Sequence, residues 1–200
     1  TVAVDLETYD PNLKTKGSGA ITGNGFVCGI AVATHKQTLY FPIKHAMTSN
    51  LNEDKTWDTL NKLIFQNKNI AKVFHNAMYD VCWIRATTGL MLKGPIYDTM
   101  IAASVIDENR MKYSLDALSK DYLDDSKYKW DLKDKSLSQY GISDPISNMH
   151  KLPYVLVKDY AEQDVSLTFR LWDLFSKKLD EIIYPPKGKS PRKIFNLETK

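Results

Sequence analysis

Short apolar runs rich in β-branched residues open the chain. Val2–Leu6, Phe26–Ala33 and Thr38–Ile43 are three such runs, and the turn-like residues 35–37 separate the last two. This pattern predicts one strand followed by a hairpin. Residues 9–25 hold four of the nine glycines together with Asn, Ser and Pro, so we expect a flexible loop that borders the first strand.

From Asp54 onward, helical and strand-like patterns alternate. Apolar residues recur at three- and four-residue steps in the predicted helices and form short runs in the predicted strands. The last helix is the longest, because it starts near Pro153, which a first helical turn tolerates, and continues until Pro185. The other expected elements are a helix from Asp54 to Phe65, a strand at Ile70–His75, a helix at Ala77–Thr87, a strand at Pro95–Tyr97, and helices at Thr99–Ile106 and Ser114–Tyr122.

This order of elements predicts an α/β fold. Strands that come first as a meander and then alternate with helices give a mixed β-sheet flanked by α-helices on its faces. A ribonuclease H-like sheet has this order. We assign residues 1–183 to one such domain.

Charge distinguishes the end of the chain from the rest. The formal net charge is +3, but residues 184–200 alone hold five basic side chains against one acid, a balance of +4, which leaves −1 (+3 less +4) for the first 183 residues. Any basic surface for a nucleic acid must therefore be local. We interpret residues 184–200, which contain three prolines, as a basic linker or the start of a following domain.

Composition also bears on the compartment. Cys28 and Cys82 lie far apart inside apolar stretches, which favours buried free thiols in a reducing compartment over a disulfide. No apolar run approaches the ~20 residues that a membrane helix needs, and no signal-like segment opens the chain. We therefore expect a soluble, cytoplasmic protein without a membrane partner. Because the sequence starts without methionine, we also expect that it is a piece of a longer chain.

Asp5 and Glu7 lie two residues apart in the first predicted strand, so both carboxylates project from one face. Asp-x-Glu is also common on solvated strand faces, and this alternative stays open for the motif taken alone. The apolar run at residues 1–4 that leads into the pair favours a central strand, whose end is a frequent position for a functional site.

A third acid, Asp80, lies in the first turn of a predicted helix, just after an apolar strand. An ordinary helix start explains this segment equally well, because Asn76 would cap the helix and Asp80 would lie near the positive end of its dipole. This segment alone therefore does not decide whether Asn76 and Asp80 are functional residues.

The last predicted helix carries the fourth acid. Tyr160 and Asp164 are four residues apart, one turn along the same face, which they share with Val157, Leu167 and Leu171. A carboxylate on an apolar face is costly unless it is paired or bound to a cation. Asp164 is therefore either a functional group or half of a buried hydrogen bond to Tyr160 or a lysine.

All four acids are placed where an element is expected to point inward. Hard oxygen ligands of this kind suit Mg²⁺ or Mn²⁺ better than zinc, which prefers nitrogen and sulfur. Two such ions, roughly 3.5–4 Å apart, can clamp a scissile phosphate. The set that predicts phosphodiester hydrolysis comprises Asp5, Glu7, Asp80 and Asp164.

Three segments resemble, in order, the motifs of the DEDD exonuclease superfamily: Asp5-Leu6-Glu7-Thr8, Asn76-Ala77-Met78-Tyr79-Asp80 and Tyr160-Ala161-Glu162-Gln163-Asp164. The tyrosine is similar to that of the DEDDy branch, because the sister branch would need a histidine where Asp159 stands. Residues 97–103, 114–118 and 194–198 further resemble the 3′-5′ exonuclease (proofreading) domain of family A, polymerase I-like DNA polymerases, including those of phages. Residues 124–152 match no part of that family, and we interpret them as an insertion or lid near the substrate groove.

The resemblance implies a metal-dependent 3′-5′ exodeoxyribonuclease that acts on the 3′ end of single-stranded or frayed DNA with two Mg²⁺ or Mn²⁺ ions. It also implies proofreading for a polymerase domain in the same chain, in a bacterial or phage-infected cell. Asp5, Glu7 and Asp164 would bind the ion that carries the attacking water, Asp5 would be shared with the second ion, and Asp80 would hold that ion mainly through water. Tyr160 and Glu7 would orient the water. Strand-binding roles are implied for Leu6, Thr8, Asn76 and Tyr79.

Two alternatives remain open. An RNase D-like 3′-5′ exoribonuclease shares the same motifs, and contacts to the 2′ hydroxyl would separate the two activities. The other is a non-catalytic nucleic-acid-binding relic of the same fold. Such relics usually lose an acid, whereas all four acids and the tyrosine are present here.

Overall fold

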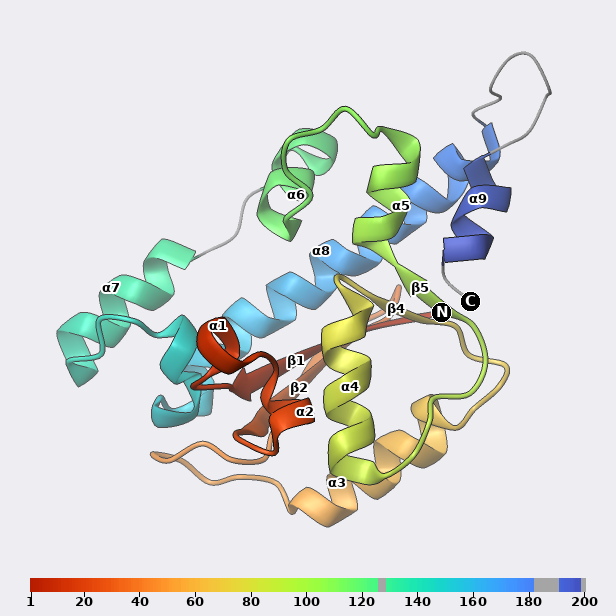
Figure 1. Cartoon of the computed structure of the whole chain (residues 1–200). Coiled ribbons are helices and arrows are strands. Elements are labelled where there is room, and N and C mark those ends of the chain that lie inside the picture. Colours follow the sequence, from red (N-terminus) through yellow and green to blue (C-terminus); the bar gives the residue numbers. More distant parts are fainter. Residues whose placement is uncertain (126–128, 182–190, 199–200) are drawn as a thin grey trace.

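A five-stranded mixed sheet forms the centre of the computed structural model, which describes residues 1–125, 129–181 and 191–198. The strand order is β3-β2-β1-β4-β5 (Figure 1). β1 pairs antiparallel with β2 and parallel with β4, and β3 and β5 extend the sheet on either side. The strands are β1 Val2–Tyr9, β2 Phe26–Ala33, β3 Thr38–Pro42, β4 Lys72–Phe74 and β5 Ile96–Asp98.

Helices cover both faces of this sheet, so the predicted α/β architecture is confirmed. Figure 1 shows α4 in front of the strands and the long α8 behind them. Within the described residues, no helix is long and apolar enough to cross a bilayer. The helices are α1 Leu13–Lys16, α2 Gly19–Thr22, α3 Glu53–Leu60, α4 Ala77–Thr88, α5 Thr99–Ile106, α6 Leu115–Leu123, α7 Lys129–Tyr140, α8 Tyr154–Glu181 and α9 Pro191–Glu198.

The alternation of side chains along β1 assigns its residues to two cores. Ala3 packs into the core that α5, α6 and α8 share, whereas Val4 and Leu6 pack into the core on the side of α3 and α4. Each fully buried Leu or Phe in these cores contributes about 1.5–3 kcal/mol. Because successive strand residues point to opposite faces, Asp5 and Glu7 follow Ala3 toward α8.

Three segments differ from the prediction. Residues 9–25 are not a single flexible loop, because α1 and α2 form within them, and with four residues each they are too short to show a hydrophobic period. α3 continues into a π-helical turn, Asn61–Phe65. The unassigned residues 124–152 contain α7 and a 3₁₀ helix, Ile146–Lys151, while residues 126–128 lie outside the described part.

The final helix, α9, packs onto the domain. Phe195 is fully buried, with its ring 6.0 Å from that of Tyr97 and 5.6 Å from that of Trp172. Residues 184–200 are expected to form a basic linker or the start of a following domain. Of these, residues 191–198 form a helix that packs onto this domain, and residues 182–190 lie outside the described part. The domain boundary after residue 183 stays a prediction.

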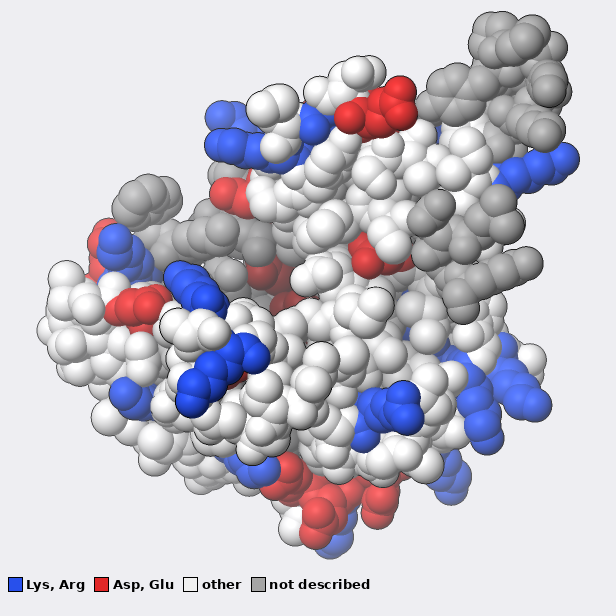
Figure 2. All heavy atoms as spheres, viewed as in Figure 1, with Lys and Arg blue, Asp and Glu red and all other residues white. Residues whose placement is uncertain are grey.

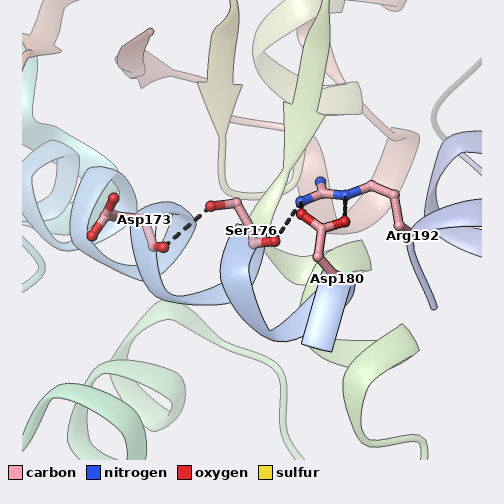
Figure 3. A network of polar contacts seen from close by, with 4 residues as sticks. All are labelled: Asp173, Ser176, Asp180 and Arg192. Carbon is pink, nitrogen blue, oxygen red and sulfur yellow. Dashed lines mark hydrogen bonds and ion pairs between the residues drawn. The ribbon is translucent and has the colours of Figure 1, made fainter. Parts of the chain in front are cut away.

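An ion pair adds to this contact, as Figure 3 shows. Arg192 of α9 donates to both carboxylate oxygens of Asp180 on α8, each at 2.9 Å, and also to the backbone carbonyl of Ser176. A paired guanidinium–carboxylate contact fixes orientation as well as position, so α9 is held at a defined angle to α8.

Phe195→Ala is expected to lower the free energy of unfolding by about 3–5 kcal/mol, the usual cost of removing a buried aromatic ring. For a domain of this size, this corresponds to a fall in the melting temperature of roughly 6 °C or more. Thermal unfolding followed by circular dichroism measures the shift. Ile194→Ala, at a neighbouring side chain that is 47% exposed, serves as the control, and equal melting of the two variants would contradict the packing of α9.

Candidate active site

Asp5 and Glu7 lie on the central strand β1, on the face that looks toward α8. Glu7 is only 7% exposed and Asp5 is half-buried. In the sheet they pair with Ala31 and Gly29 of β2. The two carboxylates therefore share one face of a largely buried strand, as the spacing predicts, and the alternative of a solvated strand face is wrong for this pair.

Asp80, in the first turn of α4, is joined directly to this strand. Its Oδ1 accepts a hydrogen bond of 3.1 Å from the backbone N–H of Leu6, which lies between the other two acids. Asp80 is 3% exposed, and burial is the main reason that its pKa is raised well above the usual value. The charge of Asp5 raises the pKa further, whereas the Leu6 N–H opposes the shift. Two acids from distant segments are thus in electrostatic contact.

Tyr160 and Asp164 bring α8 to the same place. Both are buried, at 7% and 5% exposure. The pKa of Tyr160 is raised, chiefly by burial and then by the charges of Asp164, Glu7 and Asp5. The structure therefore brings the tyrosine and the predicted acids of all three motifs together around one site.

The surface view agrees with a recessed acidic site. Figure 2 shows acidic atoms deep in a hollow of the face that it displays, with basic atoms on the side where Figure 1 places α1. A surface of this kind favours anions at the basic rim of the hollow and cations at its acidic floor.

The donor chemistry of the site suits a hard divalent cation, because every predicted ligand is a carboxylate. No three His, Cys, Asp or Glu side chains among the described residues already surround one point at coordination distance. The acids would therefore have to rearrange to hold an ion together.

Three of the residues expected to bind the DNA strand, Leu6, Thr8 and Tyr79, already make hydrogen bonds within the protein. Tyr79 donates its hydroxyl to Asp10 at 3.1 Å, and it lies 2.7 Å from the Thr8 hydroxyl, which therefore acts as the donor in that pair. Asp10 in turn accepts from the backbone N–H of Gly19 at 3.0 Å. Tyr79 and Thr8 thus tie the loop of α1 and α2 to the site. The backbone N–H of Leu6 is engaged by Asp80.

Asn76 is exposed and adopts a left-handed backbone conformation, with φ 70° and ψ 56°. Its side chain makes no hydrogen bond to the start of α4, so the interpretation of Asn76 as an ordinary helix cap is wrong. Its amide is therefore not committed to capping.

A hydrogen-bonded pair, the buried His45 and the half-buried Tyr40, lies close to Glu7, and no sequence motif marks it. The His45 Nδ1 donates to the carbonyl of Leu152 at 2.9 Å, so its Nε2 accepts the Tyr40 hydroxyl at 2.7 Å. A side chain at position 29 would meet the Tyr40 oxygen at 1.9 Å, and Gly29 is the partner of Glu7 in the sheet. Glycine is therefore required for the Tyr40 phenol to lie beside Glu7.

Residues 146–151 pack beside the end of β1. The His150 ring lies 4.2 Å from that of Tyr9 and 5.5 Å from that of Phe26. This part of the segment 124–152 borders the site, and its role as a lid stays a prediction.

The predicted free thiols are confirmed, with Cys28 buried and Cys82 half-buried.

Known proteins with similar sequences and folds agree with this geometry. The 3′-5′ exonuclease family model matches residues 1–180. The DNA-directed DNA polymerase of Pseudomonas phage M6 is 30% identical over 197 residues, which cover 90% of this chain and 27% of that protein. DNA polymerase I of Borreliella burgdorferi is 26% identical over 190 residues, covering 90% of this chain and 20% of that protein. The chain thus spans about a quarter of these curated relatives or less.

Among solved structures, Brucella melitensis NrnC with bound Mg²⁺ superposes with a TM-score of 0.60 at 19% identity, over 90% of this chain and 73% of that one. This likeness shows the fold, which is the ribonuclease H-like mixed sheet that the order of elements predicts. The family match over residues 1–180 places the chain in the 3′-5′ exonuclease domain family of polymerase I-like DNA polymerases.

Proposed function

We propose that the domain hydrolyses the 3′-terminal phosphodiester of single-stranded or frayed DNA and so proofreads for a DNA polymerase. The observation that carries this proposal is the convergence of Asp5, Glu7, Asp80 and Asp164 from three distant segments. A buried acid such as Asp80, whose pKa is raised by burial and by the charge of Asp5, is unfavourable unless a cation or a reaction uses it. The polymerases among its relatives support DNA as the substrate and a polymerase as the partner.

Two divalent ions, Mg²⁺ or Mn²⁺, would supply a water of lowered pKa and stabilise the charge on the leaving 3′ oxygen. Asp5, Glu7 and Asp164 would hold the first of them. Asp5 would be shared with the second, and Asp80 would hold that ion mainly through water. The all-carboxylate donor set and the Mg²⁺ in the NrnC structure support this assignment.

The protein groups position the reactants. Tyr160, buried beside Asp164 and Glu7, would orient the attacking water together with Glu7 for in-line displacement. Asn76, exposed at the start of α4, and Tyr79 would contact the sugar-phosphate chain, and Thr8 and the Leu6 backbone would lie near the 3′ hydroxyl of the terminal nucleotide. Contacts of this kind follow the backbone, so we expect little sequence preference.

The test compares 5′-labelled DNA and RNA oligonucleotides of one sequence, each with Mn²⁺ and with EDTA. We expect stepwise shortening of DNA from its 3′ end, faster for single strands and mispaired ends than for paired ends, and none in EDTA. Equal or faster shortening of RNA would favour the exoribonuclease alternative. A domain that shortens neither polymer would fit a non-catalytic relic.

A further inference from the structure

Asp98, the last residue of β5, accepts hydrogen bonds from the first turns of two helices. Its Oδ1 binds the N–H of Met100 in α5 at 2.8 Å and the N–H of Asn76 at 3.1 Å. Its Oδ2 binds the N–H of Ala77 in α4 at 2.7 Å. The side chain is 5% exposed. One buried carboxylate therefore caps two helices. Asp98 is the N-cap residue of α5, and it also caps α4, which follows a different strand, β4.

The start of α4 depends on this external cap. Asn76 holds a left-handed conformation that is uncommon for a residue other than glycine, and such conformations persist only where the surroundings impose them. The N–H groups at the beginning of a helix have no partner within the helix. Because the Asn76 side chain does not supply one, the two bonds from Asp98 hold this turn.

Thr99 adds a second tie to the same turn. Its hydroxyl donates to the carbonyl of Phe74 at 3.2 Å, so it accepts from the His75 Nδ1 at 2.9 Å. Asp98 and Thr99 together bind four consecutive positions, residues 74–77. The junction of β4 and α4 is thereby fixed to the end of β5.

This junction determines where Asp80 lies. Asp80 follows Ala77 by three residues, within the first turn of α4, and its Oδ1 must reach the Leu6 N–H on β1. A change in the direction or rotation of α4 would break that contact. Asp98 also lies close enough to raise the pKa of Asp80. The Asp98 carboxylate itself lies at the N-termini of two helices, where backbone N–H groups favour negative charge.

We propose that Asp98 is a positioning residue for Asp80, holding α4 in the orientation that allows Asp80 to serve a divalent ion beside Asp5. This inference rests on the proposed nuclease function. Outer groups that orient metal ligands typically affect metal affinity or activity by about 10- to 100-fold when removed, and Asp98 orients its ligand through the helix itself.

Asp98→Ala and Asp98→Asn test the inference, with Asn52→Ala as the matched control. Asn52 caps α3 by accepting from the Lys55 N–H at 2.9 Å and belongs to no part of the proposed site. For each variant, the kcat of DNA shortening, the Mn²⁺ concentration at half-maximal rate, Mn²⁺ affinity by calorimetry and the melting temperature are measured.

We expect Asp98→Ala to lower kcat and to raise the Mn²⁺ requirement, each by about 10- to 100-fold, at temperatures where the protein is fully folded. Asp98→Asn should fall between it and the wild type, because the amide oxygen can keep the bonds to Asn76 and Met100 while the bond to Ala77 is lost. Asn52→Ala should lower the melting temperature and leave kcat and the Mn²⁺ requirement unchanged.

Two outcomes would overturn the inference. One is a folded Asp98→Ala variant with wild-type kcat and Mn²⁺ affinity, and the other is an equal loss in Asn52→Ala, which would reveal general loosening of the fold. A wild-type domain without activity would refute the proposed function instead. Mn²⁺ affinity would then still decide whether Asp98 acts on the cation site.

Discussion

Replacing Asp5 by alanine is expected to lower the rate of strand shortening by on the order of 10³-fold or more. Asp5 lies at the centre of the acidic set, because its charge raises the pKa of both Asp80 on α4 and Tyr160 on α8. In the proposed mechanism Asp5 would be a ligand of both ions, so its loss would weaken the binding of each. Single-turnover shortening of a labelled DNA strand at saturating Mn²⁺ measures the effect.

Two variants make this expectation specific. Tyr160→Phe keeps every carboxylate and should slow the reaction by on the order of 10²-fold, at the low end of what a positioned proton-transfer group contributes. Asp159→Ala removes an exposed carboxylate next to Tyr160 and should leave the rate unchanged. If Asp5→Ala digests single-stranded DNA at the wild-type rate, the reaction takes place elsewhere on the molecule.

The site could be predicted from the sequence where local geometry determines it. A spacing of two in a strand and of four in a helix places side chains on one face, and both rules hold for Asp5 with Glu7 and for Tyr160 with Asp164. Most strands and helices were predicted for the same reason, because their hydrophobic period is carried within each segment.

Features that depend on contacts between segments could not be predicted in this way. The role of Asp98 is one such feature, since its bonds to Asn76 and Ala77 exist only because β4 and β5 are neighbours in the sheet. Likewise, the requirement for Gly29 follows from the path of Tyr40 across the sheet. The composition of residues 184–200 indicates a linker or the start of a following domain, and it gives no sign that Phe195 packs against α5 and α8.

Bringing these acids together lowers the stability of the folded state. Four acids are held close together by elements whose other contacts are apolar, so the stability of those cores offsets the repulsion. Replacing one of these acids by its amide should therefore lower activity without lowering stability, provided that the amide keeps the hydrogen bonds of the acid.

Asp80→Asn is expected to stabilise the metal-free domain at neutral pH while it lowers the rate of strand shortening by on the order of 10²-fold. Burial and Asp5 raise the pKa of Asp80 above its ordinary value, so the folded state holds the proton more tightly than the unfolded state does. The free energy of unfolding then falls as pH rises from about 4, the ordinary pKa of aspartate, through the folded pKa. Asparagine has no proton to lose, and its carbonyl can still accept from Leu6.

Melting temperatures in EDTA at pH 5 and at pH 7.5 measure this effect. The advantage of Asp80→Asn over the wild type should grow with pH, and each kcal/mol corresponds to about 2–4 °C in a domain of this size. Asp58→Asn, at an exposed position of α3, removes the same charge and should shift melting little. Mn²⁺ should stabilise the wild type more than Asp80→Asn, since binding to the folded state alone adds stability. A variant that melts below the wild type at pH 7.5 without metal would mean that the Asp80 carboxylate is already stabilised by the protein, and that no cation is needed to account for it.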